Sequence, residues 1–163
     1  MDGATGMTPE AMLERLVAFP TVSSESNLEL IGFVRDWLAG QGVDARIVPS
    51  EDGTKAGLFA QIGPAVPGGV VLSAHTDVVP VEGQPWSSDP FTLAERNGRL
   101  YGRGTADMKG FAALALALVP EMRRAGLKRP VQIALSHDEE VGCLGAPALI
   151  AAMREALPPA SAC

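Results

Sequence analysis

Two stretches near the N-terminus carry apolar residues at helical spacing. In the first, residues 8–10 are Thr-Pro-Glu, which supplies a cap, a favoured first helical residue and an acidic first turn, so we predict a helix that ends near Ala18. In the second, Ser26 and Glu29 have the spacing of a capping box. The apolar stripe after them comprises Leu30, Ile31, Val34, Trp37 and Leu38, and Gly40 ends it. The pattern predicts two amphipathic helices.

Short apolar runs farther along the chain predict strands. Residues 43–48 and 57–62 flank turn-forming residues and predict a hairpin, and the dipeptide at 97–98, Asn-Gly, predicts a second, tight one. Residues 70–74 form the kind of apolar run that a central strand covered on both faces shows, and residues 131–136 form another. Polar clusters follow both of these strands, at the end where open α/β sheets place ligands.

The C-terminal half also contains helical patterns. Residues 108–125 are apolar on almost every face in their first part, which predicts one buried helix that ends at Gly126. Pro147 opens a last helix, and Pro158 and Pro159 close it. Helices that alternate with strands in this way predict an α/β fold.

Composition and charge restrict the partners that we expect. The 163 residues are 47% hydrophobic and 20% charged, the balance of a soluble globular domain rather than of a disordered chain. The net charge is −6, with 13 basic and 19 acidic side chains and no basic run, so nothing neutralises a phosphate backbone or an anionic membrane. We expect neither nucleic acid nor a membrane as a partner.

The remaining compositional features favour the cytoplasm. The apolar run at residues 111–120 is about half of the ~20 residues that a membrane span needs, and acidic Asp2 stands where a signal peptide would be basic. Cys143 and Cys163 give no disulfide framework, and we expect Cys143 to be a small buried residue. Residues 1–6 show no periodicity, and we expect a flexible N-terminus there.

Three clusters carry candidate chemistry: His-Thr-Asp at 75–77, the glycine-containing segment 102–107, and Asp-Glu-Glu at 138–140. His75 and Asp77 project on the same side of an extended strand, so one can ligate a metal while the other orients it. Each cluster taken singly also has an ordinary explanation, as polar residues at a strand end or acids at a helix start.

The adjacent residues Glu139 and Glu140 would repel each other if buried without a partner. Their position after an apolar strand therefore indicates either exposure to water or a nearby cation. With a divalent metal bound, one glutamate can ligate it while the other takes a proton from water as general base.

Taken together and in this order, the clusters resemble a known family. Residues 73–80, 101–110 and 138–142 are similar to the successive signatures of the acetylornithine deacetylase and succinyl-diaminopimelate desuccinylase family of two-zinc hydrolases. Residues 138–146 resemble the acetylornithine deacetylases most closely. The resemblance implies a three-layer αβα, zinc-peptidase-like catalytic domain with a mixed, mostly parallel sheet that is incomplete at its C-terminal side.

The resemblance also implies roles for the site residues. His75 would ligate one zinc, Glu140 the other, and Asp107 would bridge the two, with cobalt as an alternative metal. Asp77 would hold His75, and Glu139 would be the general base. The family further implies a cis peptide bond between Asp107 and Met108.

The activity implied is hydrolysis of the acyl amide of an N-acetylated amino acid. The first expectation is conversion of N2-acetyl-L-ornithine to ornithine and acetate in arginine biosynthesis, by a protein that forms a homodimer when full length. The alternatives are succinyl-diaminopimelate desuccinylase, another aminoacylase or dipeptidase of the family, or a catalytically inactive truncated fragment.

Chain length limits the site that we expect. In the family another acidic ligand follows, and a histidine ligand comes much later, after an inserted dimerisation domain. We therefore expect residues 7–163 to be the N-terminal portion of the catalytic domain, with the dimerisation domain and the C-terminal catalytic segment absent. Each zinc then keeps two protein ligands instead of three, which predicts weak binding. His137 is expected to be an ordinary strand-end residue.

Overall fold

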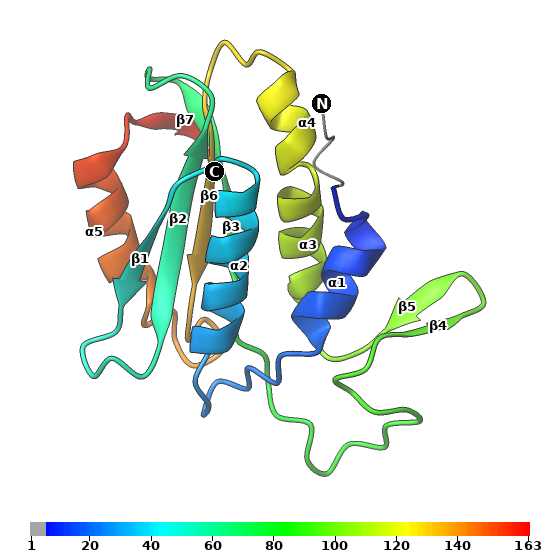
Figure 1. Cartoon of the computed structure of the whole chain (residues 1–163). Coiled ribbons are helices and arrows are strands. Elements are labelled where there is room, and N and C mark those ends of the chain that lie inside the picture. Colours follow the sequence, from blue (N-terminus) through cyan, green and yellow to red (C-terminus); the bar gives the residue numbers. More distant parts are fainter. Residues whose placement is uncertain (1–5) are drawn as a thin grey trace.

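A five-stranded sheet forms the centre of the computed structural model, which describes residues 6–163 (Figure 1). The strand order is β1-β2-β6-β3-β7. The strands are β1 (Ala45–Pro49), β2 (Ala56–Ile62), β3 (Gly69–His75), β6 (Val131–Ser136) and β7 (Ala160–Ala162). The β1–β2 and β2–β6 pairs are antiparallel, whereas β6–β3 and β3–β7 are parallel. The sheet is mixed, as predicted, but parallel pairs do not outnumber antiparallel ones among the described strands.

Helices cover both faces of this sheet and make the predicted three layers. On one side lie α1 to α4, and on the other lies α5 (Figure 1). The helices are α1 (Pro9–Val17), α2 (Leu28–Gly40), α3 (Lys109–Ala117), α4 (Val119–Arg124) and α5 (Ala146–Ala156). The predicted tight hairpin is present as β4 (Ala94–Arg96) and β5 (Arg99–Tyr101), and it projects away from the sheet.

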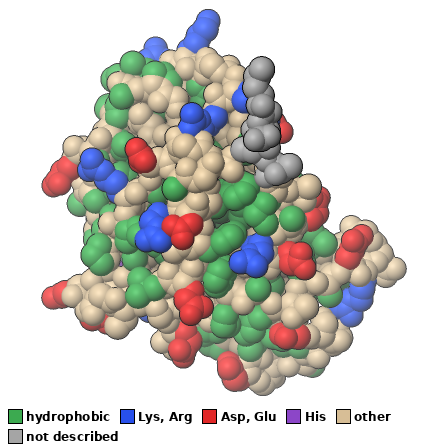
Figure 2. Space-filling model, in the orientation of Figure 1, with side chains coloured by type: hydrophobic (Ala, Val, Ile, Leu, Met, Phe, Trp, Pro, Cys, Tyr) green, Lys and Arg blue, Asp and Glu red, His purple; other side chains and the backbone are tan. Residues whose placement is uncertain are grey.

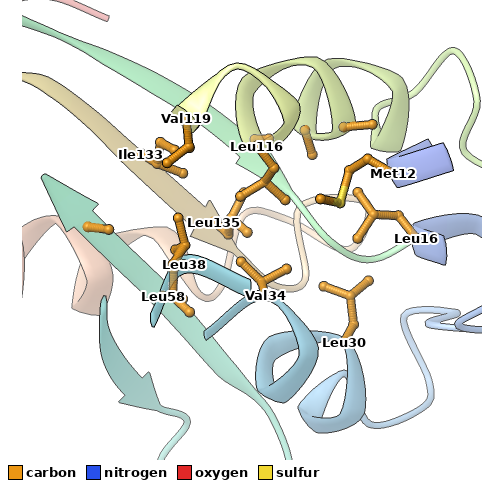
Figure 3. Packing of buried hydrophobic residues seen from close by; sticks show 14 of the residues in the cluster. Met12, Leu16, Leu30, Val34, Leu38, Leu58, Leu116, Val119, Ile133 and Leu135 are labelled. Carbon is orange, nitrogen blue, oxygen red and sulfur yellow. The ribbon is translucent and has the colours of Figure 1, made fainter. Parts of the chain in front are cut away.

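The larger core lies between the sheet and helices α1 to α4, where side chains from both layers meet (Figure 3). Because side chains alternate along a strand, Leu58 and Ala60 of β2 face this core, whereas Phe59 faces α5 and packs with Ala134 and Leu149. Burial of a Leu or Phe side chain contributes roughly 1.5–3 kcal/mol, so this alternation fixes the register of the strand.

The predicted single helix over residues 108–125 is wrong in two respects. It is divided at Leu118 into α3 and α4, because Pro120 has no N–H to continue the helical hydrogen bonds. One face of it is also open: Phe111, Leu114 and Leu118 are 40%, 50% and 39% exposed. The apolar run is therefore buried on its sheet-facing side only.

The predicted capping box at the start of α2 is wrong as well. The helix begins at Leu28, and the Ser26 hydroxyl accepts the N–H of that residue at 3.2 Å. Asn27 occupies the cap position without a capping hydrogen bond from its side chain. Its amide instead donates to the Ala56 carbonyl and to the Thr76 hydroxyl, so a tertiary role replaces the local one.

Other expectations have mixed outcomes. Val70 and Ser73 of β3 are exposed, so this strand is not covered on both faces by the described residues. Cys143 is exposed rather than buried. Across residues 6–163, no helix combines the length and apolar character that a bilayer crossing requires. Five of the six residues expected to be a flexible N-terminus lie outside the described residues, and the sixth, Gly6, is exposed.

Candidate metal site

The site is built where β3 and β6 end side by side. The two strands are parallel, His75 is paired with Ser136, and the Thr76 N–H donates to the Ser136 carbonyl at 3.0 Å. The polar segments that follow the two strands, 75–77 and 137–140, therefore meet at one edge of the sheet. The pairing brings together residues more than 60 positions apart, as the sequence predicts.

The His75 ring is buried, with 4% of the residue exposed, and both of its nitrogens have partners. Nδ1 lies 2.9 Å from the backbone carbonyl oxygen of Asp77. Nε2 faces two carboxylates, at 3.1 Å from Asp107 Oδ1 and 3.8 Å from Glu139 Oε2. In the neutral ring, a proton on Nδ1 would donate to the carbonyl and leave the Nε2 lone pair free for a metal.

A group of three residues could hold a cation. One ligand atom each from His75, Glu139 and Glu140 lies within 4.8 Å of the others. Asp107 is the fourth member of the cluster through its contact with His75 Nε2, and 75% of its side chain is exposed. All four predicted residues therefore lie around one small volume.

The electrostatics of this volume fit a divalent cation. Burial raises the pKa of Glu140, and the nearby negative charges of Asp107 and Glu139 raise it further, against the opposite effect of His75. A carboxylate whose pKa is raised by negative neighbours is stabilised in its charged form when a positive ion lies beside it. One imidazole with three carboxylates is also a donor set that zinc accepts.

Asp77 connects the two strand ends. Its carboxylate accepts the backbone N–H groups of Glu139 at 3.1 Å and Glu140 at 3.2 Å, and the hydroxyl of Ser23 at 2.7 Å. Burial opposes the charged form of Asp77, but hydrogen bonds from His75, Ser23 and these N–H groups hold its pKa well below the ordinary range. The predicted contact with His75 is present, at 3.5 Å from Nδ1 to Oδ1. The same carboxylate also fixes the Glu139–Glu140 turn.

The pKa of His75 reflects these neighbours. Burial of the ring lowers it, but hydrogen bonds to Asp77 and Asp107 outweigh that effect and raise the pKa to about 9. Without a metal, both ring nitrogens therefore carry a proton at neutral pH, and the ring is positively charged. A cation that binds Nε2 has to displace the proton there.

The segment around Asp107 is fastened by a buried lysine. The Asp107–Met108 peptide bond is cis, as predicted. Lys109, 1% exposed, donates from Nζ to the Phe19 carbonyl at 2.6 Å, and burial lowers the pKa of its amine to about 7. Gly104 has φ 85° and packs so closely on Val78 that a Cβ there would lie 2.9 Å from Val78 Cγ1.

Four residues around the site were not predicted from the sequence: Ser23, Asn27, Lys55 and Lys109. Each makes its site contact with residues at least 29 positions away. Local patterns carry no signal for such contacts. Only the glycine-containing motif next to Lys109 could have drawn attention to one of them.

Comparison with known proteins extends these observations. The family model described as Peptidase family M20/M25/M40 matches residues 71–162. Acetylornithine deacetylase of Pasteurella multocida is 39% identical over 142 residues, which cover 83% of this chain and 37% of that protein. Acetylornithine deacetylase of Shigella sonnei is 40% identical over 139 residues, which cover 80% of this chain and 36% of that protein. The chain thus spans little more than a third of the length of these relatives.

A solved structure matches the fold. The M20 family metallo-carboxypeptidase from Sulfolobus solfataricus superposes with a TM-score of 0.80 at 23% identity, over 96% of this chain and 36% of that one. At this identity the match concerns the arrangement of the sheet and helices.

Proposed function

Because the chain belongs to peptidase family M20/M25/M40, we propose that His75, Asp107, Glu139 and Glu140 form part of a two-metal site that hydrolyses the acyl amide of an N-acetylated amino acid. The observation that carries this proposal is the meeting of one imidazole and three carboxylates at the ends of β3 and β6. Family membership makes the chain a hydrolase in type. The reaction and its substrate are the proposal.

Two divalent ions, zinc or in its place cobalt, are the proposed cofactors. His75 and Glu140 would each hold one ion, and Asp107 would contact both. When bound, such ions polarise the acyl carbonyl and lower the pKa of water. The rise that Asp107 and Glu139 cause in the Glu140 pKa supports a cation in this place.

Glu139 is the proposed general base. Its side chain is 45% exposed, so it can reach a water molecule and a substrate, and its backbone is fixed by Asp77. It would take the proton from the attacking water and pass it to the leaving amine nitrogen. Asp77 would keep His75 and the Glu139–Glu140 turn in a constant relative position.

The proposed substrate is N2-acetyl-L-ornithine, which would give ornithine and acetate in arginine biosynthesis. The support is that both curated relatives are named acetylornithine deacetylase. A desuccinylase of succinyl-diaminopimelate, or another aminoacylase or dipeptidase of the family, is the second candidate. The solved structure with the matching fold is named a metallo-carboxypeptidase, so a peptide is included among the substrates to be tested.

A substrate panel tests the proposal. The longest natural protein that contains this chain would be loaded with zinc and given N2-acetylornithine, N-acetylmethionine, succinyl-diaminopimelate and a dipeptide. We expect metal-dependent release of acetate from N2-acetylornithine with the highest kcat/KM. A preference for the succinyl compound or the dipeptide would identify that compound as the substrate in place of N2-acetylornithine. Turnover of all four compounds that persists after the metal is removed by a chelator would refute the metal site.

A further inference from the structure

A partly buried lysine outside the four-residue cluster, Lys55, links two of the segments around that cluster. Lys55 Nζ donates to Asp138 Oδ1 at 2.5 Å and to the Ser23 carbonyl oxygen at 2.5 Å. The side chains of Lys55 and Asp138 are 17% and 11% exposed, so the ion pair is largely removed from water. Lys55 comes immediately before β2, 83 positions from Asp138.

Asp138 is the residue directly before the proposed base, and its backbone is in an unusual conformation. Its φ is 57°, in the left-handed region that non-glycine residues seldom adopt. Its carboxylate has one oxygen on Lys55 and the other 3.0 Å from Nδ1 of His137. Two side chains thus hold Asp138 in the conformation that turns the chain from β6 toward Glu139.

Ser23 connects Lys55 to Asp77. Its carbonyl accepts from Lys55, while its hydroxyl donates to Asp77 Oδ2 at 2.7 Å. Asp77 in turn accepts the N–H groups of Glu139 and Glu140. The turn is therefore attached at both ends to one network, to which Lys55 contributes the ammonium group that pairs with Asp138.

We propose that Lys55 is a positioning residue: through Asp138 and Ser23 it holds the Glu139–Glu140 turn in the geometry that the candidate metal site needs. The part of this proposal that concerns metal affinity rests on the proposed function. The part that concerns the turn does not, because it follows from contacts in the metal-free chain. A neutral residue at position 55 would leave the Asp138 charge buried without its partner, so the turn should loosen first.

The first experiment measures the turn itself, without metal. Amide hydrogen exchange of Glu139 and Glu140 is followed by NMR in the full chain and in Lys55→Met. We expect these two amides to exchange about 10-fold faster or more in the variant, relative to the Leu135 amide inside β6. Arg123→Met is the matched control, because Arg123 donates to the carbonyls of Gln41 and Gly42 on the surface, and it should leave the ratio unchanged.

The second experiment measures metal affinity with cobalt(II) alone, through its visible absorption. Loss of a group that supports metal ligands typically weakens binding 10- to 100-fold, and we expect a loss of that order in Lys55→Met and in Asp138→Asn. Lys55→Arg, which keeps a cation at this position, should recover part of the affinity.

The two experiments separate the possible failures. Unchanged exchange of Glu139 and Glu140 in Lys55→Met, or an equal rise at Leu135, would overturn the positioning role. Faster exchange at the turn together with no cobalt binding by the unmodified chain would leave that role in place and overturn the part of the proposal that concerns metal affinity. Cobalt binding that is equal in the unmodified chain and both variants would refute the effect of Lys55 on the site.

Discussion

The carboxylate of Asp77 accepts the backbone N–H of Glu139 at 3.1 Å, and this bond joins the ends of two parallel strands. Asp77 follows β3 and Glu139 follows β6. The bond therefore places the proposed base relative to His75, which is two residues before Asp77. Fold stability and site geometry depend on the same buried side chain.

Asp77→Ala should destabilise the fold as well as the site. It removes the buried acceptor of hydrogen bonds from Ser23, Glu139 and Glu140, and it leaves the Ser23 hydroxyl without that acceptor in a buried place. We expect the free energy of unfolding to fall by about 3 kcal/mol, measured by urea denaturation at neutral pH. Asp36→Ala, which breaks an exposed ion pair with Arg35, is the control and should change little.

Glu139→Gln and Glu140→Gln should have different effects although the residues are adjacent. In the longest natural protein containing this chain, Glu139→Gln should keep the metal and lower kcat about 100- to 10,000-fold, the usual range for a general base. Glu140→Gln should lose metal, because an amide is a poorer ligand than a carboxylate. Metal analysis beside steady-state kinetics distinguishes the two, and full activity in Glu139→Gln would contradict the assignment.

Leu135→Ala tests the core on which the site rests. Leu135 is 1% exposed, lies on β6 one residue before Ser136, and meets side chains of the helical layer (Figure 3). Truncation of such a leucine costs 2–5 kcal/mol, so the urea midpoint should drop accordingly. Leu144→Ala removes the same atoms from a residue that is 64% exposed, and an equal loss there would contradict the role of burial.

Local patterns predicted the strands that carry the site and the meeting of their ends. Apolar runs identified β3 and β6, and the parallel arrangement explains why His75 and the Glu139–Glu140 pair come together. The break between α3 and α4 was missed although Pro120 signals it, since the apolar pattern on either side is continuous. The sequence contains no basic run, and on the face shown in Figure 2 Lys and Arg side chains are interspersed with Asp and Glu.

The supporting contacts around the site could not be predicted in the same way. Asn27 has the residue type of a helix cap, yet its amide bonds to Ala56 and Thr76 because tertiary packing offers it buried partners. Lys55 has the residue type of a solvated surface position, and only the fold brings it to Asp138. Contacts of this kind depend on which loops the sheet order places together, and that information is not local.

The pKa of His75 predicts how stability of the metal-free chain varies with pH. Because the folded-state pKa is about 9 against an ordinary 6.5, folding is favoured by proton binding, and that contribution is complete below pH 6.5. It should be lost as the pH rises from 6.5 through about 9, a decrease of about 3 kcal/mol. An NMR titration of the ring checks the pKa, and Asp107→Asn should lower it. A ring that titrates near its ordinary value would refute the prediction.

Zinc should bind this chain weakly, and more strongly as the pH rises. In the proposed arrangement one ion has His75 and Asp107 and the other has Asp107 and Glu140, whereas a catalytic zinc normally has three protein ligands and a water. A proton on His75 competes with the metal at neutral pH, so affinity should increase up to about pH 9. After loading and dialysis at neutral pH, we expect the chain to retain well under two equivalents, measured by atomic emission. Retention of nearly two equivalents would mean that groups outside the proposed four complete the coordination, and Glu140→Gln would then show whether that residue is a ligand at all.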